Sequence, residues 1–198
     1  MPLTPAVEAE IAALAARYGA PRRITATLNG NPFSPVTQFD RYGEVCMVVR
    51  RRNGRLLTAI KTFYPAGCFR LLTGGVAHGE TIETALRREV EEETGLQTVI
   101  RRFLAVVEYQ PYAFATFAFL LDERGGELGS RDPHERLGAF REIEVSELPA
   151  LAATLEAAPD RWDAEIGGNW RDWGRFRAIV HRVVYEVLTS GATGNAPG

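Results

Sequence analysis

Three glutamates lie where the spacing of a predicted helix calls for apolar side chains. The segment GETIETALRREVEEETGL spans residues 79–96, and apolar residues recur with helical spacing through its first half. Glu89, Glu92 and Glu93 continue the same stripe towards the C-terminus. On a helical wheel these carboxylates crowd one arc within less than two turns, whereas Glu91 points away. The fold must therefore either solvate this arc or bring a cation to it.

Charge repulsion gives the three carboxylates a reason to bind a metal ion. Thr81 is a suitable N-cap and Gly95 suits the position after the last turn, so a helix is expected over about 81–94. Like charges this close repel, and partial burial raises their pKa values unless a cation intervenes. A hard divalent ion such as Mg²⁺ prefers carboxylate oxygens. A solvated acidic helix end is the alternative, and the helix alone does not decide between the two.

The loop before this helix favours the metal interpretation. Gly74, Gly75 and Gly79 lie between a short predicted strand, 69–73, and the helix. Glycines allow a ligand to approach the backbone closely, and the free amides at a helix N-terminus attract anions. Phosphate oxygens and a metal ion would therefore meet at one site.

The complete spacing resembles the motif of a known enzyme family. The Nudix box reads Gly-x5-Glu-x7-Arg-Glu-U-x-Glu-Glu-x-Gly-U, where U is aliphatic, and every specified position is met between residues 74 and 96. The strands expected over about 43–143 fit the order of the family's α/β/α sandwich. The first 40 residues and the last 50 lie outside the motif. The matching residues are Gly74, Glu80, Arg88, Glu89, Val90, Glu92, Glu93, Gly95 and Leu96.

The resemblance implies a set of metal ligands. Glu89, Glu92 and Glu93 correspond to the metal-binding carboxylates, with Glu92 and Glu93 as the central pair. The family commonly has Leu-Pro-Gly-Gly at the start of the motif, whereas this chain has Leu-Leu-Thr-Gly at 71–74. The carbonyl of Thr73 therefore takes a backbone ligand position that Gly usually supplies. The implied ion is Mg²⁺, with Mn²⁺ as an alternative.

The resemblance also assigns supporting roles around the metal. Arg88 and Glu80 correspond to partners that hold the loop against the helix, and Gly95 ends the helix. Glu135 resembles a further acid that binds a second metal or serves as general base. Asp132, Glu142 and a purely surface role for Glu135 remain open alternatives. The implied catalytic set is Glu89, Glu92, Glu93, Arg88 and Glu135.

The rest of the chain favours an α+β fold with a mixed β-sheet and helical extensions at both ends. A β-hairpin is expected from GEVCMVVRR and LLTAIKTF around Asn53-Gly54. The expected organisation is an N-terminal helix and connector over 1–40, the Nudix domain over 41–150, C-terminal helices packed on it over 151–189, and a flexible tail over 190–198.

The implied reaction is hydrolysis of a pyrophosphate bond in a nucleoside diphosphate linked to another moiety. Pro111 resembles a mark of ADP-ribose-type members, and Tyr112 beside it resembles a mark of dinucleoside polyphosphate members, so the pair decides nothing. Gly74 and Gly75 are candidate substrate-binding residues. Arg52 and Lys61 are further candidates, although a solvated basic hairpin is an alternative for both. Tyr112 is also a candidate, since it could stack on a base, with core or rim packing as its alternative.

Composition narrows the class of partner. The formal net charge is −2, which gives no reason to expect nucleic acid or an anionic membrane as the main partner. Cys46 and Cys68 form no metal or disulfide pattern and are expected to be reduced and buried in a cytoplasmic protein. No signal peptide or membrane span is predicted. A small nucleotide substrate is expected, a homodimer is left open, and a non-catalytic ligand sensor and an RNA-processing enzyme are the alternative functions.

Overall fold

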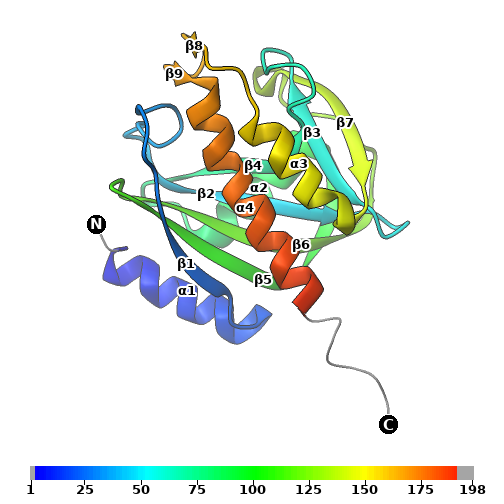
Figure 1. Ribbon diagram of the computed structural model, residues 1–198. Coiled ribbons are helices and arrows are strands. Elements are labelled where there is room, and N and C mark those ends of the chain that lie inside the picture. The colour runs from blue at the N-terminus through cyan, green and yellow to red at the C-terminus, as the bar shows by residue number, and fades with distance from the viewer. Residues whose placement is uncertain (1–2, 191–198) are drawn as a thin grey trace.

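The computed structural model describes residues 3–190 as an α/β/α sandwich built on a seven-stranded mixed sheet (Figure 1). The strand order is β1-β5-β6-β2-β4-β3-β7. The β1–β5 and β2–β6 pairs are parallel, and the other neighbours are antiparallel. The strands are β1 (Arg22–Thr27), β2 (Arg41–Arg50), β3 (Leu56–Lys61), β4 (Arg70–Ala77), β5 (Leu96–Gln110), β6 (Phe114–Gly126) and β7 (Leu137–Ile143).

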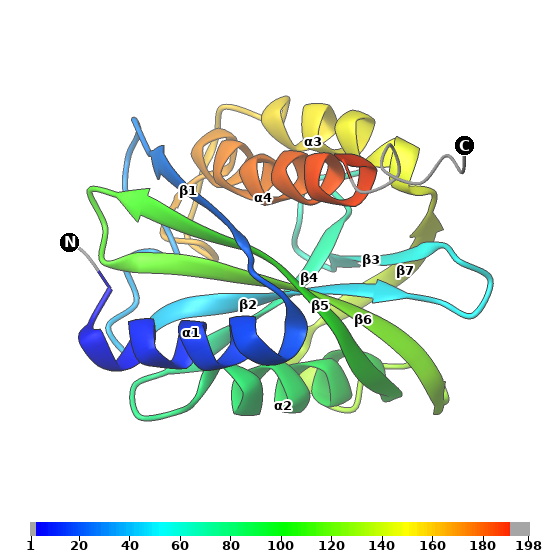
Figure 2. The same ribbon diagram turned by 90° about the horizontal axis from the view of Figure 1, so that it is seen from below.

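Helices cover both faces of the sheet (Figure 2). Because successive side chains of a strand point to opposite faces, alternate residues of β2 enter two separate cores. Val45 and Met47 pack with α1 and α2, whereas Cys46 and Val48 pack with α3 and α4. The expected α+β sandwich with helical extensions is confirmed. The helices are α1 (Pro5–Tyr18), α2 (Ile82–Thr94), α3 (Leu148–Glu156) and α4 (Trp170–Ser190).

Short elements complete the chain. Two 3₁₀ turns, η1 and η2, flank β7, and a two-stranded ribbon, β8 and β9, precedes α4. Their bounds are η1 (Pro133–Glu135), η2 (Val145–Glu147), β8 (Trp162–Asp163) and β9 (Gly168–Asn169).

The bounds of α2 agree closely with the sequence. The Thr81 hydroxyl accepts a hydrogen bond from the backbone N–H of Thr84, which caps the first turn. Gly95 adopts a left-handed conformation, φ 65°, and its N–H donates to the carbonyl of Glu91. Only glycine reaches this conformation without strain, so the helix ends where the motif requires it to end.

Two expectations about the sheet are corrected. The hairpin between β2 and β3 is formed only next to its turn, at Arg50 and Leu56, because β4 inserts between the two strands. The connector expected after α1 contains β1, an edge strand that pairs with β5. Its residues, RRITAT, bury no side chain completely, which explains why their pattern did not stand out as a strand.

The C-terminal helices and both cysteines contribute to the buried core. Trp170 and Trp173, in the first turn of α4, are buried, whereas Trp162 is 65% exposed. Cys46 and Cys68 are buried free thiols. Among residues 3–190 no helix combines the length and apolarity that a membrane crossing needs. The tail expected over 190–198 falls, beyond Ser190 at the end of α4, outside the described residues.

Candidate active site

The inward face of α2 carries two buried carboxylates and one at the rim. Glu89 and Glu93 are 6% and 1% exposed. Glu92 is half-buried, and its carboxylate pairs with Arg88 at 3.0 Å. The structure therefore separates Glu92 and Glu93, which the sequence treated as the central pair. Glu93 points inward, and Glu92 lies at the edge.

Glu93 is a buried carboxylate without a hydrogen-bond partner. Neither of its oxygens has a donor within reach. Burial raises the pKa of Glu93 to about 8, and the nearby charges of Arg70 and Lys61 oppose that rise only in part. A carboxylate in this position is costly for the protein unless it meets a proton or a cation.

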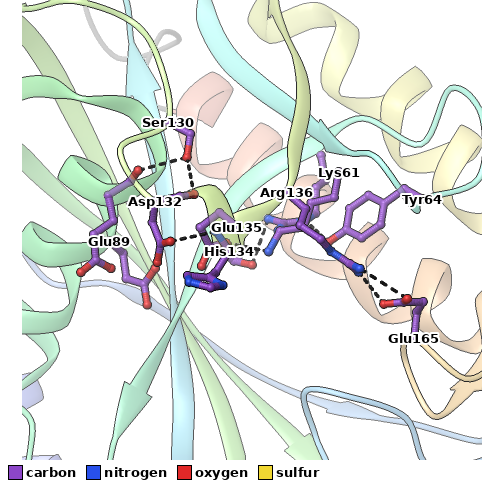
Figure 3. A network of polar contacts seen from close by, with 12 residues as sticks. Lys61, Tyr64, Glu89, Ser130, Asp132, His134, Glu135, Arg136 and Glu165 are labelled. Atoms are coloured by element: carbon purple, nitrogen blue, oxygen red, sulfur yellow. Dashed lines mark hydrogen bonds and ion pairs between the residues drawn. The ribbon is translucent and has the colours of Figure 1, made fainter.

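Glu135 approaches Glu93 and Glu89 from the loop before β7. One carboxylate oxygen from each of the three residues lies within 4.8 Å of the others. Lys61 donates to Glu135 at 2.6 Å (Figure 3). Burial alone would raise the pKa of Glu135, but the hydrogen bond and charge of Lys61 outweigh it and hold that pKa below its usual range.

The competing acids near Glu135 have other partners. The Asp132 carboxylate accepts from the backbone N–H of His134 and so caps η1. Glu142 accepts from the side chain of Asn53 at 2.8 Å. Of the three acids considered from the sequence, the structure brings only Glu135 to the α2 carboxylates.

Arg88 ties the glycine loop to α2. Its guanidinium donates to both carboxylate oxygens of Glu80, at 2.9 and 3.0 Å, and to the carbonyl of Gly75 at 3.1 Å. The same side chain donates to Glu89 and Glu92. These contacts correspond to the supporting role predicted for Arg88 and Glu80, and they fix the carboxylate of Glu89 from one side.

Gly74 makes room for Glu89 on the other side. A Cβ atom at Gly74 would lie 1.9 Å from the carboxyl carbon of Glu89. At Gly75 a Cβ atom would lie 2.4 Å from Nη1 of Arg41. A larger residue at Gly74 would displace the carboxyl group of Glu89, and one at Gly75 would displace the guanidinium of Arg41.

These groups open into a cleft of about 260 Å³ between β4, α2 and the loop before β7. Of the predicted site residues, Lys61, Thr73, Gly74, Gly75, Glu89 and Glu135 line it. Arg52 does not reach it, because that guanidinium lies at the β2–β3 turn and donates to the carbonyl of Arg124. Tyr112 also lies elsewhere, in two neighbouring cavities.

A basic wall of three arginines belongs to the same cleft. Arg41, Arg70 and Arg177 line it, and the buried Glu44 accepts from Arg177 at 2.7 Å. None of these four residues was predicted from the sequence as part of the site. Two of them had a visible signal, since Arg70 and Glu44 are charges inside otherwise apolar strand segments, FRLLT and GEVCMVV. Arg177 had none, because α4 contains several arginines on all sides.

The cluster fits a hard divalent cation. Glu93 offers two unpartnered buried oxygens, and Glu89 and Glu135 bring further carboxylate oxygens into the same space. Oxygen donors of this kind suit Mg²⁺ or Mn²⁺ rather than a softer metal. Glu89, Glu93 and Glu135 would hold the ion, and Thr73 lines the cleft together with Glu89 and Glu135.

Comparisons with known proteins agree with this geometry. The family model described as NUDIX domain matches residues 41–165. The NAD-capped RNA hydrolase NudC of Photobacterium profundum is 34% identical over 118 residues, which cover 58% of this chain and 42% of that protein. The ADP-ribose pyrophosphatase of Methanocaldococcus jannaschii is 35% identical over 109 residues, which cover 53% of this chain and 63% of that protein.

The likeness extends to a solved structure. The crystal structure of a UDP-X diphosphatase superposes with a TM-score of 0.51 at 13% identity and covers 80% of this chain and 68% of that chain. At this identity the likeness is one of fold. The chain spans less than half the length of the NudC protein that it matches.

Proposed function

The chain belongs to the Nudix family, and we propose that it is a pyrophosphohydrolase that requires a divalent metal ion. It would add water across a P–O–P bond in a nucleoside diphosphate linked to a second moiety. The products are a nucleoside monophosphate and the phosphorylated second moiety. The cytoplasmic location proposed with it is supported by the two buried free thiols, and homodimerisation stays a prediction.

One observation carries the proposal: the buried, unpartnered carboxylate of Glu93 beside Glu89 and Glu135. A divalent ion bound there would neutralise phosphate oxygens and lower the pKa of a nearby water molecule. The chain itself supplies positive charge for the substrate from Arg41, Lys61 and Arg70. Gly74 and Gly75 let a phosphate approach the backbone of β4 closely.

The substrate class follows from the two sides of the cleft. Acids that hold a cation share the cleft with Arg41, whose guanidinium can attract an anion, so the space beside them suits a diphosphate. ADP-ribose and NAD, named in the two relatives, both carry a diphosphate between two ribosyl groups. A small nucleotide of this type is the substrate that we propose.

RNA that carries such a nucleotide at its 5′ end is a second candidate. It is favoured by the 34% identity to a protein named as a hydrolase of NAD-capped RNA. The formal net charge of −2 gives the chain no general attraction for an RNA backbone. Free nucleotide therefore ranks ahead of capped RNA.

A substrate panel tests both candidates. The purified protein is incubated with ADP-ribose, NAD, UDP-glucose, nucleoside triphosphates and a short NAD-capped RNA, with Mg²⁺ and with a chelator in excess, and the products are separated by chromatography. We expect chelator-sensitive cleavage of ADP-ribose or NAD into two monophosphates. Preference for the capped RNA over free NAD by tenfold or more would favour the second candidate. Nucleotide binding without any cleavage would contradict the enzyme and favour the sensor.

A further inference from the structure

A second, larger cavity adjoins the acidic cleft. It has a volume of about 740 Å³ and is formed by residues within 3–10, 36–42, 78–80 and 112–113. We call it the α1 chamber, because the first turns of α1 form one wall. Most of the residues that line the chamber precede residue 41, where the match to the family model begins. The chamber is therefore built largely by the N-terminal extension of this chain.

The α1 chamber has the chemistry of a ligand pocket. Its walls are mainly apolar and aromatic, with Val7, Val36, Phe39 and Tyr112 among them. Phe39 is 97% exposed, an unusual position for a large apolar side chain in a protein that buries its other phenylalanines and tyrosines fully or in part. An aromatic ring at the rim of an apolar cavity is well placed to pack against a flat ligand.

A few polar groups interrupt the apolar wall. The Gln38 amide and the His78 imidazole both line the chamber, and the His78 ring lies 6.1 Å from that of Tyr42. An amide and an imidazole can pair with the edge of an aromatic heterocycle. A sugar suits the chamber poorly, because its hydroxyls would lose water against apolar walls with few hydrogen-bond partners.

Arg41 joins the chamber to the cleft. Its side chain lines both spaces, as does that of Gln38. Its guanidinium donates to Asp40 through Nε and Nη2, each at 2.8 Å, while Nη1 lies over Gly75. The hydrogen bonds of Asp40 hold the pKa of Arg41 above its usual value, so the charge is fixed at the junction. One end of a diphosphate bound in the cleft would therefore lie at Arg41. The moiety attached to that end would enter the chamber.

The two volumes support a ligand shared between both spaces. The cleft, at about 260 Å³, is smaller than the roughly 300–1,000 Å³ of pockets that bury a complete drug-sized ligand. The α1 chamber, at about 740 Å³, supplies the missing space. Occupation of the cleft alone would leave most of a nucleotide in water.

We propose that the α1 chamber binds the aromatic heterocycle on the second half of the substrate, so that a substrate with a base at each end of the diphosphate is preferred. This inference rests on the proposed function, since it places the diphosphate beside Glu89 and Glu93. Stacking on Phe39 and packing in the chamber would strengthen binding of such a substrate over one that ends in a bare sugar.

Two substrates that differ by one group provide the test. Diadenosine diphosphate is ADP-ribose with a second adenine on its terminal ribose, so the ratio of their kcat/KM values reports the binding of that base. Ala6 is exposed and lines the chamber, and Ala6→Trp fills it. Ala13→Trp is the matched control, because Ala13 is exposed on the same helix and does not line the chamber.

We expect Ala6→Trp to lower the ratio about tenfold or more, mainly through a higher KM for the dinucleotide. Phe39 is exposed, so Phe39→Ser does not disturb the core, and this variant should also lower the ratio. Ala13→Trp should leave it unchanged. An unchanged ratio in Ala6→Trp and Phe39→Ser would overturn the proposal that the α1 chamber binds a base. The proposed hydrolase function would be unaffected. Cleavage of neither substrate by a wild-type protein that cleaves another member of the panel would overturn the chamber alone, and cleavage of no member of the panel would overturn both proposals.

Discussion

Helices α2 and α4 bury charged or titratable side chains against opposite faces of one sheet, and the two sets of side chains differ in their hydrogen-bond partners. On α4, Nη1 of Arg177 donates to both oxygens of Glu44 at 2.7 Å, so the buried charges cancel. His181, on the same helix, accepts from the N–H of Leu71 and pairs with the carbonyl of Arg177. On α2, both oxygens of Glu93 lack a partner.

This difference in hydrogen bonding distinguishes buried groups that stabilise the fold from a buried group that is part of a functional site. Buried polar groups are almost always hydrogen-bonded, because an unsatisfied one costs free energy. The α4 groups obey this rule and pin the helix to the sheet, with only Nε of Arg177 left unpaired. Glu93 breaks the rule next to two further acids, which is expected where a ligand completes the site. The two helices therefore predict opposite responses to mutation.

The largest expected effect is at Glu93. Glu93→Gln keeps the size of the side chain and removes the charge that a cation needs. We expect turnover to fall about 10³-fold, since several kcal/mol of metal-assisted stabilisation is lost and each 1.36 kcal/mol is a factor of ten. The metal-free variant should be at least as stable as the wild type, because an unpartnered buried carboxylate is gone. Steady-state kinetics and thermal unfolding with chelator measure the two quantities.

Glu91→Gln is the matched control for this variant, since Glu91 is exposed on the same helix. Its turnover and stability should match those of the wild type. Equal losses of turnover in both variants would mean that turnover depends on the total negative charge of α2 rather than on the buried carboxylate of Glu93.

Breaking the pair on the α4 side should affect stability first. Glu44→Gln leaves Arg177 buried without its counter-charge, while the hydrogen bond from Thr116 can persist. The expected loss is about 3 kcal/mol in the free energy of unfolding, as for other buried pairs that lose one partner. Urea denaturation followed by circular dichroism gives this value. A loss below 0.5 kcal/mol would show that α4 does not depend on the pair.

Two glycines give a paired comparison between the helices. Gly74→Ala places a Cβ atom against the carboxyl group of Glu89, whereas Gly174→Ala places one 2.0 Å from the carbonyl oxygen of Leu155 in α3. The first should lower turnover about 10²-fold by displacing a catalytic acid. The second should lower the melting temperature, because α3 and α4 must separate. The reverse pattern, with Gly74→Ala unstable and Gly174→Ala inactive, would contradict the division of roles.

His181 predicts a pH dependence of stability. Burial lowers the pKa of His181 from an ordinary value of 6.5 to about 3. Below pH 6.5 the unfolded chain binds a proton that the folded chain does not, so stability is lost as the pH falls towards 3. Between pH 6.5 and pH 5 this amounts to about 2 kcal/mol at 1.36 kcal/mol per unit.

His181→Gln removes the titrating group and should flatten the curve over this range relative to the wild type. Denaturation midpoints at several pH values compare the two proteins. Parallel curves would assign the acid sensitivity to other groups.

Much of α2 and its loop could be predicted from sequence because the determinants are local. Thr81 and Gly95 fix the helix ends, and the spacing from Gly74 to Glu93 fixes which carboxylates share a face. Arg88 and Glu80 lie within one loop and one helix, so their contact also follows from proximity in the chain.

The basic wall could not be predicted in the same way. The contact between Glu44 and Arg177 joins β2 to α4 across 133 residues of chain, and no local pattern reports it. The same holds for the α1 chamber, whose walls come from four segments that are far apart in the chain, within 3–10, 36–42, 78–80 and 112–113. Arg52 was proposed as a substrate contact from its place in a basic hairpin, and the structure places it outside the cleft, at the β2–β3 turn. The insertion of β4 between β2 and β3 is a non-local event of this kind.

Direct titration of metal binding tests the central claim most directly. Isothermal titration calorimetry with Mn²⁺ and with Mg²⁺ on wild-type, Glu93→Gln and Glu91→Gln proteins compares the buried carboxylate with its exposed neighbour. Binding to the wild type and to Glu91→Gln, with at least a tenfold weaker Kd in Glu93→Gln, is the predicted result. Equal affinity in all three proteins would contradict the claim that the unpartnered carboxylate of Glu93 is the centre of the metal site.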